Sequence, residues 1–118
     1  MAIPNYQSYM IKTRRATAAG CLLELSQFME RFYTTNLRYD QDTAGNTVAL
    51  PATQCQADLA GYYAFALETP TARTYTLSAV PQGAQGSKDP SKCGNLTIDE
   101  TGKKRATGEG ADAGTCWR

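Results

Sequence analysis

The stretch that decides the fold is residues 21–32, which read CLLELSQFMERF. Its apolar side chains recur at steps of three and four residues, the spacing of one face of an α-helix. The polar side chains follow the same steps on the opposite side: Glu24, Gln27, Arg31 and Thr34. This pattern predicts an amphipathic helix whose core face consists of Leu22, Leu25, Phe28, Met29 and Phe32.

The same helix is expected to extend over residues 5–36. Gly20 is the only glycine in this range, which contains no proline. Pro4 precedes it, at a position where the missing N–H of proline costs nothing. A helix of this length would be about 48 Å long, more than the width of such a small domain. Its first half is more polar, so the first turns are expected to project from the body. They would offer a possible surface for contacts with partners, formed by Tyr6, Tyr9, Met10, Arg14 and Arg15.

The sequence after this helix changes its period. Residues 37–60 show no clear periodicity and predict a long connection that contains either a short element or a functional surface. Residues 61–106 then carry alternating aromatic and apolar positions, with turn residues around Pro70 and Gly102, which indicates three or four antiparallel strands. One long helix followed by a small antiparallel sheet predicts an α+β fold, with residues 1–118 as one domain.

Four cysteines, at positions 21, 55, 93 and 116, predict disulfides and an oxidising compartment. Free thiols and a four-cysteine zinc site remain alternatives, although no closely spaced pair of the kind that zinc sites use is present. Three pairings are possible. We favour Cys21–Cys55, which would tie the connection to the helix, and Cys93–Cys116, which would hold the small, polar C-terminal residues.

Composition excludes several classes of activity. The 118 residues contain no histidine, so a Ser-His-Asp or Cys-His arrangement cannot form. No phosphate-binding loop of the G-x-x-x-x-G-K-[ST] type occurs. We therefore expect no enzyme, no cofactor and no small-molecule substrate.

The charge and hydropathy of the chain indicate no particular class of partner. The net charge is +1, and no stretch has the roughly 18 consecutive apolar residues of a membrane helix. The chain as given is therefore expected to be soluble. An exported protein needs a signal, so we expect the natural N-terminal segment to lie upstream of Met1.

Two stretches resemble type IV pilins. Residues 3–16, IPNYQSYMIKTRRA, look like the segment that follows the apolar N-terminal half of these proteins. Residues 93–99, CGNLTID, together with Gly102 and the closing Cys116-Trp117, are similar to minor pilins of the PilE type with a ComP-like C-terminal region. With residues 75–79, the resemblance covers nearly the whole chain.

This resemblance implies a pilin fold and a structural role. Such subunits have a leader peptide and an apolar helix half, which holds them in the inner membrane before assembly and forms the filament core afterwards. The resemblance implies other pilins as partners, a periplasmic and then cell-surface location, and a function in pilus assembly or priming, twitching motility and attachment. It also implies that Cys93 and Cys116 bound a variable surface region, residues 93–116. Leader processing, N-terminal methylation and the identity of the neighbouring pilins are not visible in this sequence.

Two other pilin functions remain as alternatives. A DNA-uptake receptor would use basic residues, and two clusters exist: Lys12 with Arg14 and Arg15, and a second set of Lys88, Lys92, Lys103, Lys104 and Arg105. A solvated surface is the commoner meaning of such clusters, so we expect nucleic acid not to be the partner. Trp117 is expected to pack beside the C-terminal disulfide. A secretion pseudopilin could bind calcium through Asp89, Asp99 and Asp112.

Overall fold

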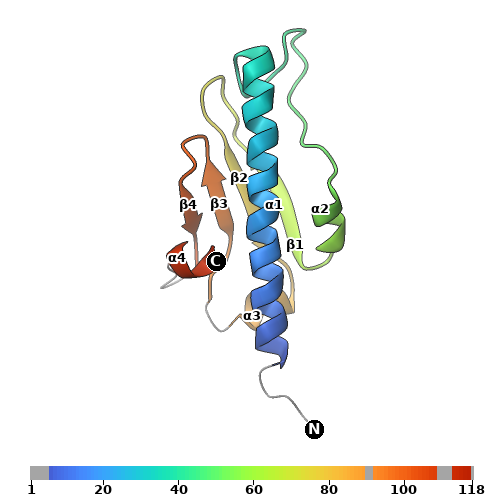
Figure 1. Ribbon diagram of the computed structural model, residues 1–118, viewed down its shortest axis with the longest axis vertical. Helices are drawn as coiled ribbons and strands as arrows, with labels where there is room; N and C mark the ends of the chain where they lie inside the picture. Colours follow the sequence, from blue (N-terminus) through green and yellow to red (C-terminus); the bar gives the residue numbers. More distant parts are fainter. Residues whose placement is uncertain (1–5, 90–91, 109–112, 118) are drawn as a thin grey trace.

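Helix α1 (Tyr6–Asn36) runs along the long axis of the molecule and lies across one face of a four-stranded antiparallel sheet (Figure 1). The computed structural model describes residues 6–89, 92–108 and 113–117. The strands follow one another across the sheet in sequence order: β1 (Tyr63–Glu68), β2 (Thr76–Pro81), β3 (Leu96–Asp99) and β4 (Lys104–Ala106). This architecture confirms the predicted α+β class.

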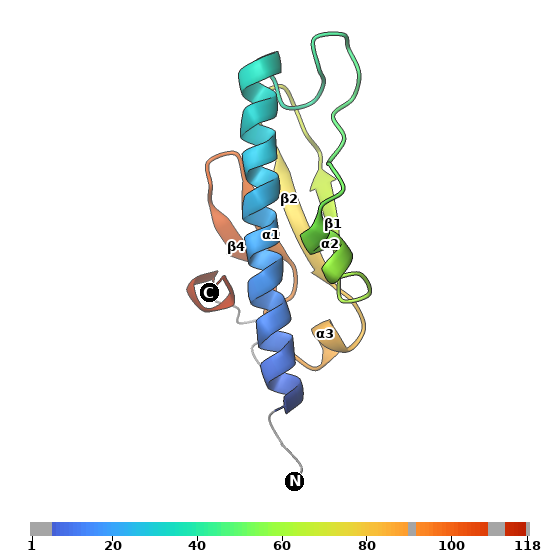
Figure 2. The ribbon, with the colours of Figure 1, turned by 45° about the vertical axis from the view of Figure 1, so that its right-hand side comes forward.

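The described residues also form three short helices: α2 (Gln54–Asp58), α3 (Ala84–Ser87) and α4 (Ala113–Cys116). Helix α2 is the short element within the connection at 37–60. Its start has a capping box, because the Thr53 side chain accepts from the Gln56 N–H while the Gln56 side chain accepts from the Thr53 N–H at 2.9 Å. Figure 2 shows α2 beside α1 and β1, and α3 beside the first turns of α1.

The end of α1 is defined by two hydrogen bonds. The Asn36 side-chain amide donates to the Phe32 carbonyl at 3.0 Å, and the Leu37 N–H donates to the Tyr33 carbonyl at 2.6 Å. Leu37 adopts φ +60°, a left-handed conformation that a helix end uses but that a leucine rarely takes. Its side chain is 75% exposed, so the chain reverses here without burying that side chain.

The core lies between α1 and the sheet. Leu22, Leu25 and Met29 are fully buried on the predicted helix face, whereas Phe28 and Phe32 are half-buried at its border. Opposite them, the alternation of each strand brings its apolar side chains to one face of the sheet: Leu77 and Ala79 on β2, and Leu96 and Ile98 on β3. Among the described residues, no helix combines the length and apolar composition of a membrane span.

The prediction that the first turns of α1 project from the body is wrong from Ile11 onward. Ile11 and Arg15 are 1% and 3% exposed. The connection after β2 folds back on this part of the helix, and the Gln85 side-chain amide donates to the Ile11 carbonyl at 2.8 Å. Tyr9, one turn earlier, is exposed.

Candidate functional site

The first half of α1, which the sequence offered as a surface for partner contacts, has a buried and an exposed part. Arg15 was expected at the surface, but its guanidinium Nη1 lies 2.9 Å from Oδ1 of Asp89, and each side chain is 4% exposed. The other Asp89 oxygen accepts the Cys93 N–H at 3.1 Å. This buried ion pair therefore joins α1 to the residue that begins the C-terminal disulfide, and Arg15 is not available to a partner.

Three of the remaining members, Tyr9, Met10 and Arg14, are at least partly exposed. Tyr9 is 65% exposed and Met10 is half-buried. The Arg14 guanidinium lies 3.9 Å from the centre of the Tyr62 ring, a cation–π contact between α1 and the turn before β1. Tyr6 begins the helix, and its side chain is outside the described part of the structure. The surface offered to a partner at this end is thus Tyr9 and Met10, with Arg14 lying over Tyr62.

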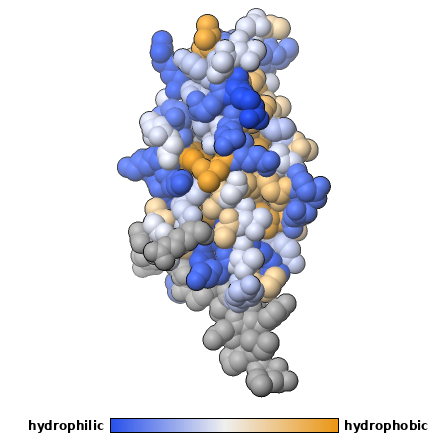
Figure 3. Space-filling view, viewed as in Figure 1, coloured by the Kyte–Doolittle hydropathy of each residue, from blue (hydrophilic) through white to orange (hydrophobic). Residues whose placement is uncertain are grey.

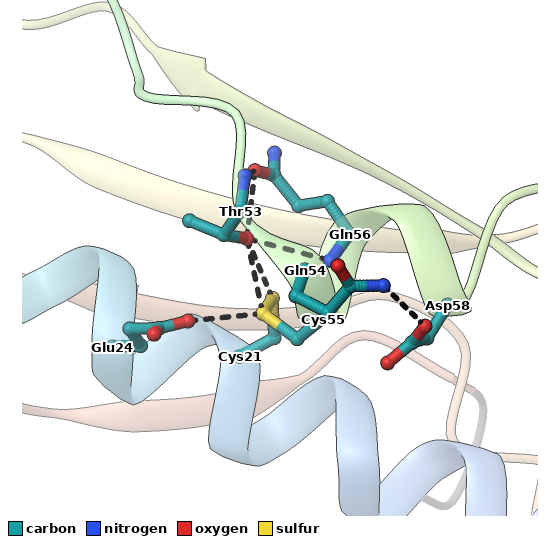
Figure 4. Close-up of a disulfide and its surroundings, with 7 residues drawn as sticks. All are labelled: Cys21, Glu24, Thr53, Gln54, Cys55, Gln56 and Asp58. Carbon is teal, nitrogen blue, oxygen red and sulfur yellow. Dashed lines mark hydrogen bonds between the residues drawn. A yellow bond between two sulfur atoms is a disulfide. The ribbon is translucent and has the colours of Figure 1, made fainter.

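The first disulfide joins Cys21 on α1 to Cys55 on α2, the pairing that the sequence favoured, with Cα atoms 5.8 Å apart. Figure 4 shows it between Thr53 and Glu24, whose Oε2 approaches the Cys55 sulfur to 3.1 Å. Because the two sulfurs are bonded to each other, neither has a proton to donate, so this is a close approach and not a hydrogen bond. Cys21, Glu24 and Cys55 bring ligand-type atoms within 4.8 Å of one another, but the disulfide removes the thiolates that a metal would need.

The second disulfide joins Cys93 to Cys116, again with Cα atoms 5.8 Å apart, and both cysteines are buried. Beside it, Trp117 packs against the core, and its indole N–H donates to the Arg105 carbonyl at 3.0 Å. Trp117 therefore docks α4 on β4. Its ring also faces solvent in part, and the Lys104 ammonium lies 5.6 Å from its centre.

The basic residues around this disulfide are accessible. Lys103, Lys104 and Arg105 are exposed on the β3–β4 hairpin. Arg105 pairs with Asp99 at 3.1 Å, which leaves the two lysines as the outward cations of the hairpin. The hydrogen bond from the Thr101 hydroxyl to Asp99, together with the Lys103 N–H, lowers the pKa of that carboxyl.

The carboxylates considered for calcium already have protein partners. Asp89 pairs with Arg15, and Asp99 accepts from Thr101, Lys103 and Arg105. Asp112 lies outside the described residues. Because the carboxylate oxygens of Asp89 and Asp99 already accept hydrogen bonds from the protein, they are poorly placed to coordinate a cation. These two residues therefore give no support to the calcium alternative.

A polar cluster at the far end of α1 was not anticipated from the sequence. The hydroxyls of Tyr39 and Tyr75 both donate to the Glu30 carboxylate, at 3.1 and 3.2 Å. Burial, followed by the hydrogen bond to Glu30, raises the pKa of Tyr39 to about 12. These residues come from α1, the connection after it and the residue before β2, so only Tyr39, nine residues after Glu30, is near it in sequence.

The outward face of α1 is mostly hydrophilic, with small separate apolar areas (Figure 3). Leu23, 38% exposed, is the large apolar side chain in the middle of this helix that faces solvent. Ala16 and Gly20, which precede it by seven and three residues, are exposed as well and leave the helix backbone accessible.

Comparisons with known proteins agree with this architecture. Residues 4–97 match the family model described as "Type IV minor pilin ComP, DNA uptake sequence receptor". A type IV pilin from Shewanella oneidensis is 31% identical, over 80% of this chain and 89% of that chain, with a TM-score of 0.55. The non-core minor pilin PilV from Neisseria meningitidis has a TM-score of 0.59 at 23% identity, over 90% and 95% of the two chains, which shows a common fold. No curated protein matches.

The family model covers well over half of the chain, and both solved pilins are similar in fold over at least 80% of it. Together with two disulfides and a helix that presents one face to solvent, these findings establish that the chain belongs to the type IV minor pilins.

Proposed function

We propose that this chain is a structural subunit that assembles with other pilins, takes part in assembly or priming of the pilus, and so supports twitching motility and surface attachment. The observation that carries this proposal is the division of α1 into two faces. One face buries Leu22, Leu25 and Met29 against the sheet, and the opposite face presents Leu23 to solvent. A helix that is exposed along one side can pack on the helices of neighbouring subunits.

A non-catalytic role fits the side chains available. The sequence has no histidine, and all four cysteines are in disulfides. The buried charged groups Arg15 and Asp89 neutralise each other between two elements. Their contribution is to hold the fold, which supports a structural assignment over an enzymatic one.

The location follows from the same proposal. Before assembly the subunit would be held in the inner membrane by an apolar helix segment upstream of α1, with the domain described here in the periplasm. After assembly the domain would lie on the surface of the pilus. The two disulfides suit an oxidising compartment.

Substitution of Leu23 tests the assembly role. Leu23→Glu places a charge on the outward face of α1, where it should spare folding, because the side chain is already 38% exposed. In a strain that lacks the native gene, the variant should restore fewer pili and less twitching than the wild-type protein.

Ala57→Glu is the matched control, since it adds the same charge at an exposed position on α2. Full complementation by Ala57→Glu with loss in Leu23→Glu supports the proposal. Equal complementation by both variants would show that the outward face of α1 does not take part in pilus assembly.

DNA binding is a second candidate, favoured by one observation. The hairpin exposes Lys103 and Lys104 beside the partly exposed ring of Trp117, a combination that suits phosphates and a stacked base. The description of the matched family names a DNA uptake sequence receptor. Fluorescence anisotropy with labelled duplexes, at rising salt, would test it: binding that weakens with salt and falls in Lys103→Gln/Lys104→Gln favours this candidate, and no binding at low salt rejects it.

A further inference from the structure

Two segments of the sequence are rich in basic residues and poor in acidic ones. The first acidic residue of the chain is Glu24, while Lys12, Arg14 and Arg15 precede it. Segments 1–23 and 84–92 together contain five basic residues and one acidic residue, although the whole chain has a net charge of only +1. The rest of the chain is therefore net negative, and these two segments carry the excess of positive charge.

The fold brings these two segments together. Gln85 binds the Ile11 carbonyl and Asp89 pairs with Arg15, so α3 and Asp89 lie against the first half of α1. Both ribbon views place α3 beside the first turns of α1 (Figures 1 and 2). Asp89 forms its ion pair with Arg15, and both side chains are buried. The other cations of these two segments are at least partly exposed, and we call them the N-terminal basic end: Lys12, Arg14, Lys88 and Lys92.

No ion pair within the described part of the chain neutralises the N-terminal basic end. Lys12, Lys88 and Lys92 are exposed, and Arg14 lies on the partly exposed Tyr62 ring. The field of these cations is therefore directed at solvent and favours an anionic partner.

Exposed aromatic and apolar groups lie among these cations. Tyr9 is 65% exposed three residues before Lys12, and Met10 is half-buried beside it. A tyrosine has an apolar ring and a polar hydroxyl, and such side chains favour the boundary between lipid and water. Lysines next to them bind anionic headgroups, each contributing about a fivefold gain in affinity near the surface.

We propose that the N-terminal basic end docks on the surface of a bilayer that contains anionic phospholipids. Lys12, Lys88 and Lys92 contact the lipid phosphates, and Tyr9 enters the headgroup layer. The proposal rests on the proposed function for one step, the orientation of the domain with the start of α1 toward the membrane. Docking of this end would hold the domain upright on the membrane before it enters a filament.

Vesicle flotation of the 118-residue chain tests this docking directly. With vesicles of phosphatidylcholine and about 40% phosphatidylglycerol, at low salt, the wild-type chain should float with the lipid, and it should stay unbound with phosphatidylcholine alone. Lys12→Gln/Lys88→Gln/Lys92→Gln should lower the partition coefficient by about a hundredfold, and Tyr9→Ala by a smaller factor. Salt should weaken the binding, since these charges are exposed to solvent.

A matched variant separates docking from general charge. Arg73→Gln/Lys103→Gln/Lys104→Gln removes the same charge from exposed positions outside the N-terminal basic end and should leave flotation unchanged. Equal loss in both triple variants, or no flotation of the wild-type chain with anionic vesicles, overturns the proposal. Binding of a DNA duplex that depends on Lys12, Lys88 and Lys92, without flotation, would assign this end to nucleic acid instead. If flotation fails while the protein still restores pili, the docking inference falls and the proposed function stands.

Discussion

Arg15 and Asp89 hold together parts of the chain that lie 74 residues apart. Both side chains are almost fully buried, so removing one partner leaves the other as an isolated charge in the interior. Arg15→Met or Asp89→Asn should lower the free energy of unfolding by about 3–5 kcal/mol, measured by urea denaturation. The double variant Arg15→Met/Asp89→Asn should recover much of this loss, because no charge is then stranded and the amide oxygen can still accept the Cys93 N–H.

Arg14→Gln provides the comparison for that series, because Arg14 is the adjacent, partly exposed arginine. It should change stability by no more than about 0.5 kcal/mol. A loss of under 1 kcal/mol in Arg15→Met would show that the pair does not anchor the connection after β2 to α1.

Tyr39 should make the fold sensitive to alkali. Its pKa is raised from about 10 in an unfolded chain to about 12 by burial and by the hydrogen bond to Glu30. A raised pKa means that the folded protein holds the proton more tightly, so this stabilisation is complete below about pH 10 and is lost as the pH rises to about 12. The difference between the tyrosinate absorbance titrations of the wild type and Tyr39→Phe reports this group directly.

The carboxylate contribution can be isolated with Glu30→Gln, which removes the charge that opposes ionisation of the Tyr39 hydroxyl. The Tyr39 midpoint should move down toward 10 but stay above it, since burial remains. A Tyr39 midpoint at about 10 in the wild-type protein would contradict the packing of this ring between Tyr33 and Tyr75.

At the scale of elements, two glycines predict opposite effects of one substitution. A Cβ on Gly108 would collide with the backbone of Lys92 and Cys93, where the Gly108 N–H donates to the Cys93 carbonyl at 2.8 Å. A Cβ on Gly20, exposed in the middle of α1, would meet no atom within 4 Å. Gly108→Ala should therefore destabilise the chain, and Gly20→Ala should stabilise it by about 0.5–1 kcal/mol.

Thermal and urea unfolding of the two glycine variants side by side would measure this contrast. The two substitutions add the same methyl group, so hydrophobicity cannot explain a difference in sign. Stabilisation by Gly108→Ala would show that residues 92–94 and 108 do not approach each other as described.

The two disulfides should contribute comparable amounts to stability. They close loops with sequence separations of 34 and 23 residues, for which chain entropy gives about 4 and about 3 kcal/mol. Cys93→Ser/Cys116→Ser should also release α4 from β4, seen as faster hydrogen exchange at the Trp117 N–H, while α1 keeps its protection. Loss of protection throughout α1 in this variant would contradict the assignment of this disulfide to the C-terminal region.

The elements that local sequence predicts well are those with strong periodicity. The three- and four-residue spacing predicted α1, and alternation predicted three or four antiparallel strands within residues 61–106, where the observed strands β1 to β4 lie. Helix α2 has only five residues, too few to show a period, and depends on its capping box and on Cys55. Arg15 is buried through its pair with Asp89, and Glu30 binds Tyr75, which lies 45 residues further along the chain. Contacts between residues so far apart in sequence produce no local pattern from which they could be predicted.

For the whole molecule, the resemblance of a few segments identified more than periodicity did. The fold class follows from α1 and the strands, but many unrelated proteins combine one helix with a small sheet. The match over residues 4–97 establishes the family, and the two solved pilins show the common fold. The excess of positive charge in residues 1–23 and 84–92 became meaningful only in three dimensions, because Gln85 and Asp89 had to be placed beside the first half of α1.

The central claim is that the protein is a subunit of the pilus itself. Its presence in pili sheared from cells and purified, detected by immunoblotting with an antibody against this chain, tests the claim most directly. The account predicts a signal in the pilus fraction, in amounts well below those of the major subunit, and no signal in the corresponding fraction from a strain that makes no pili. Confinement of the protein to the cell fraction, or an equal signal from the strain without pili, would contradict the account.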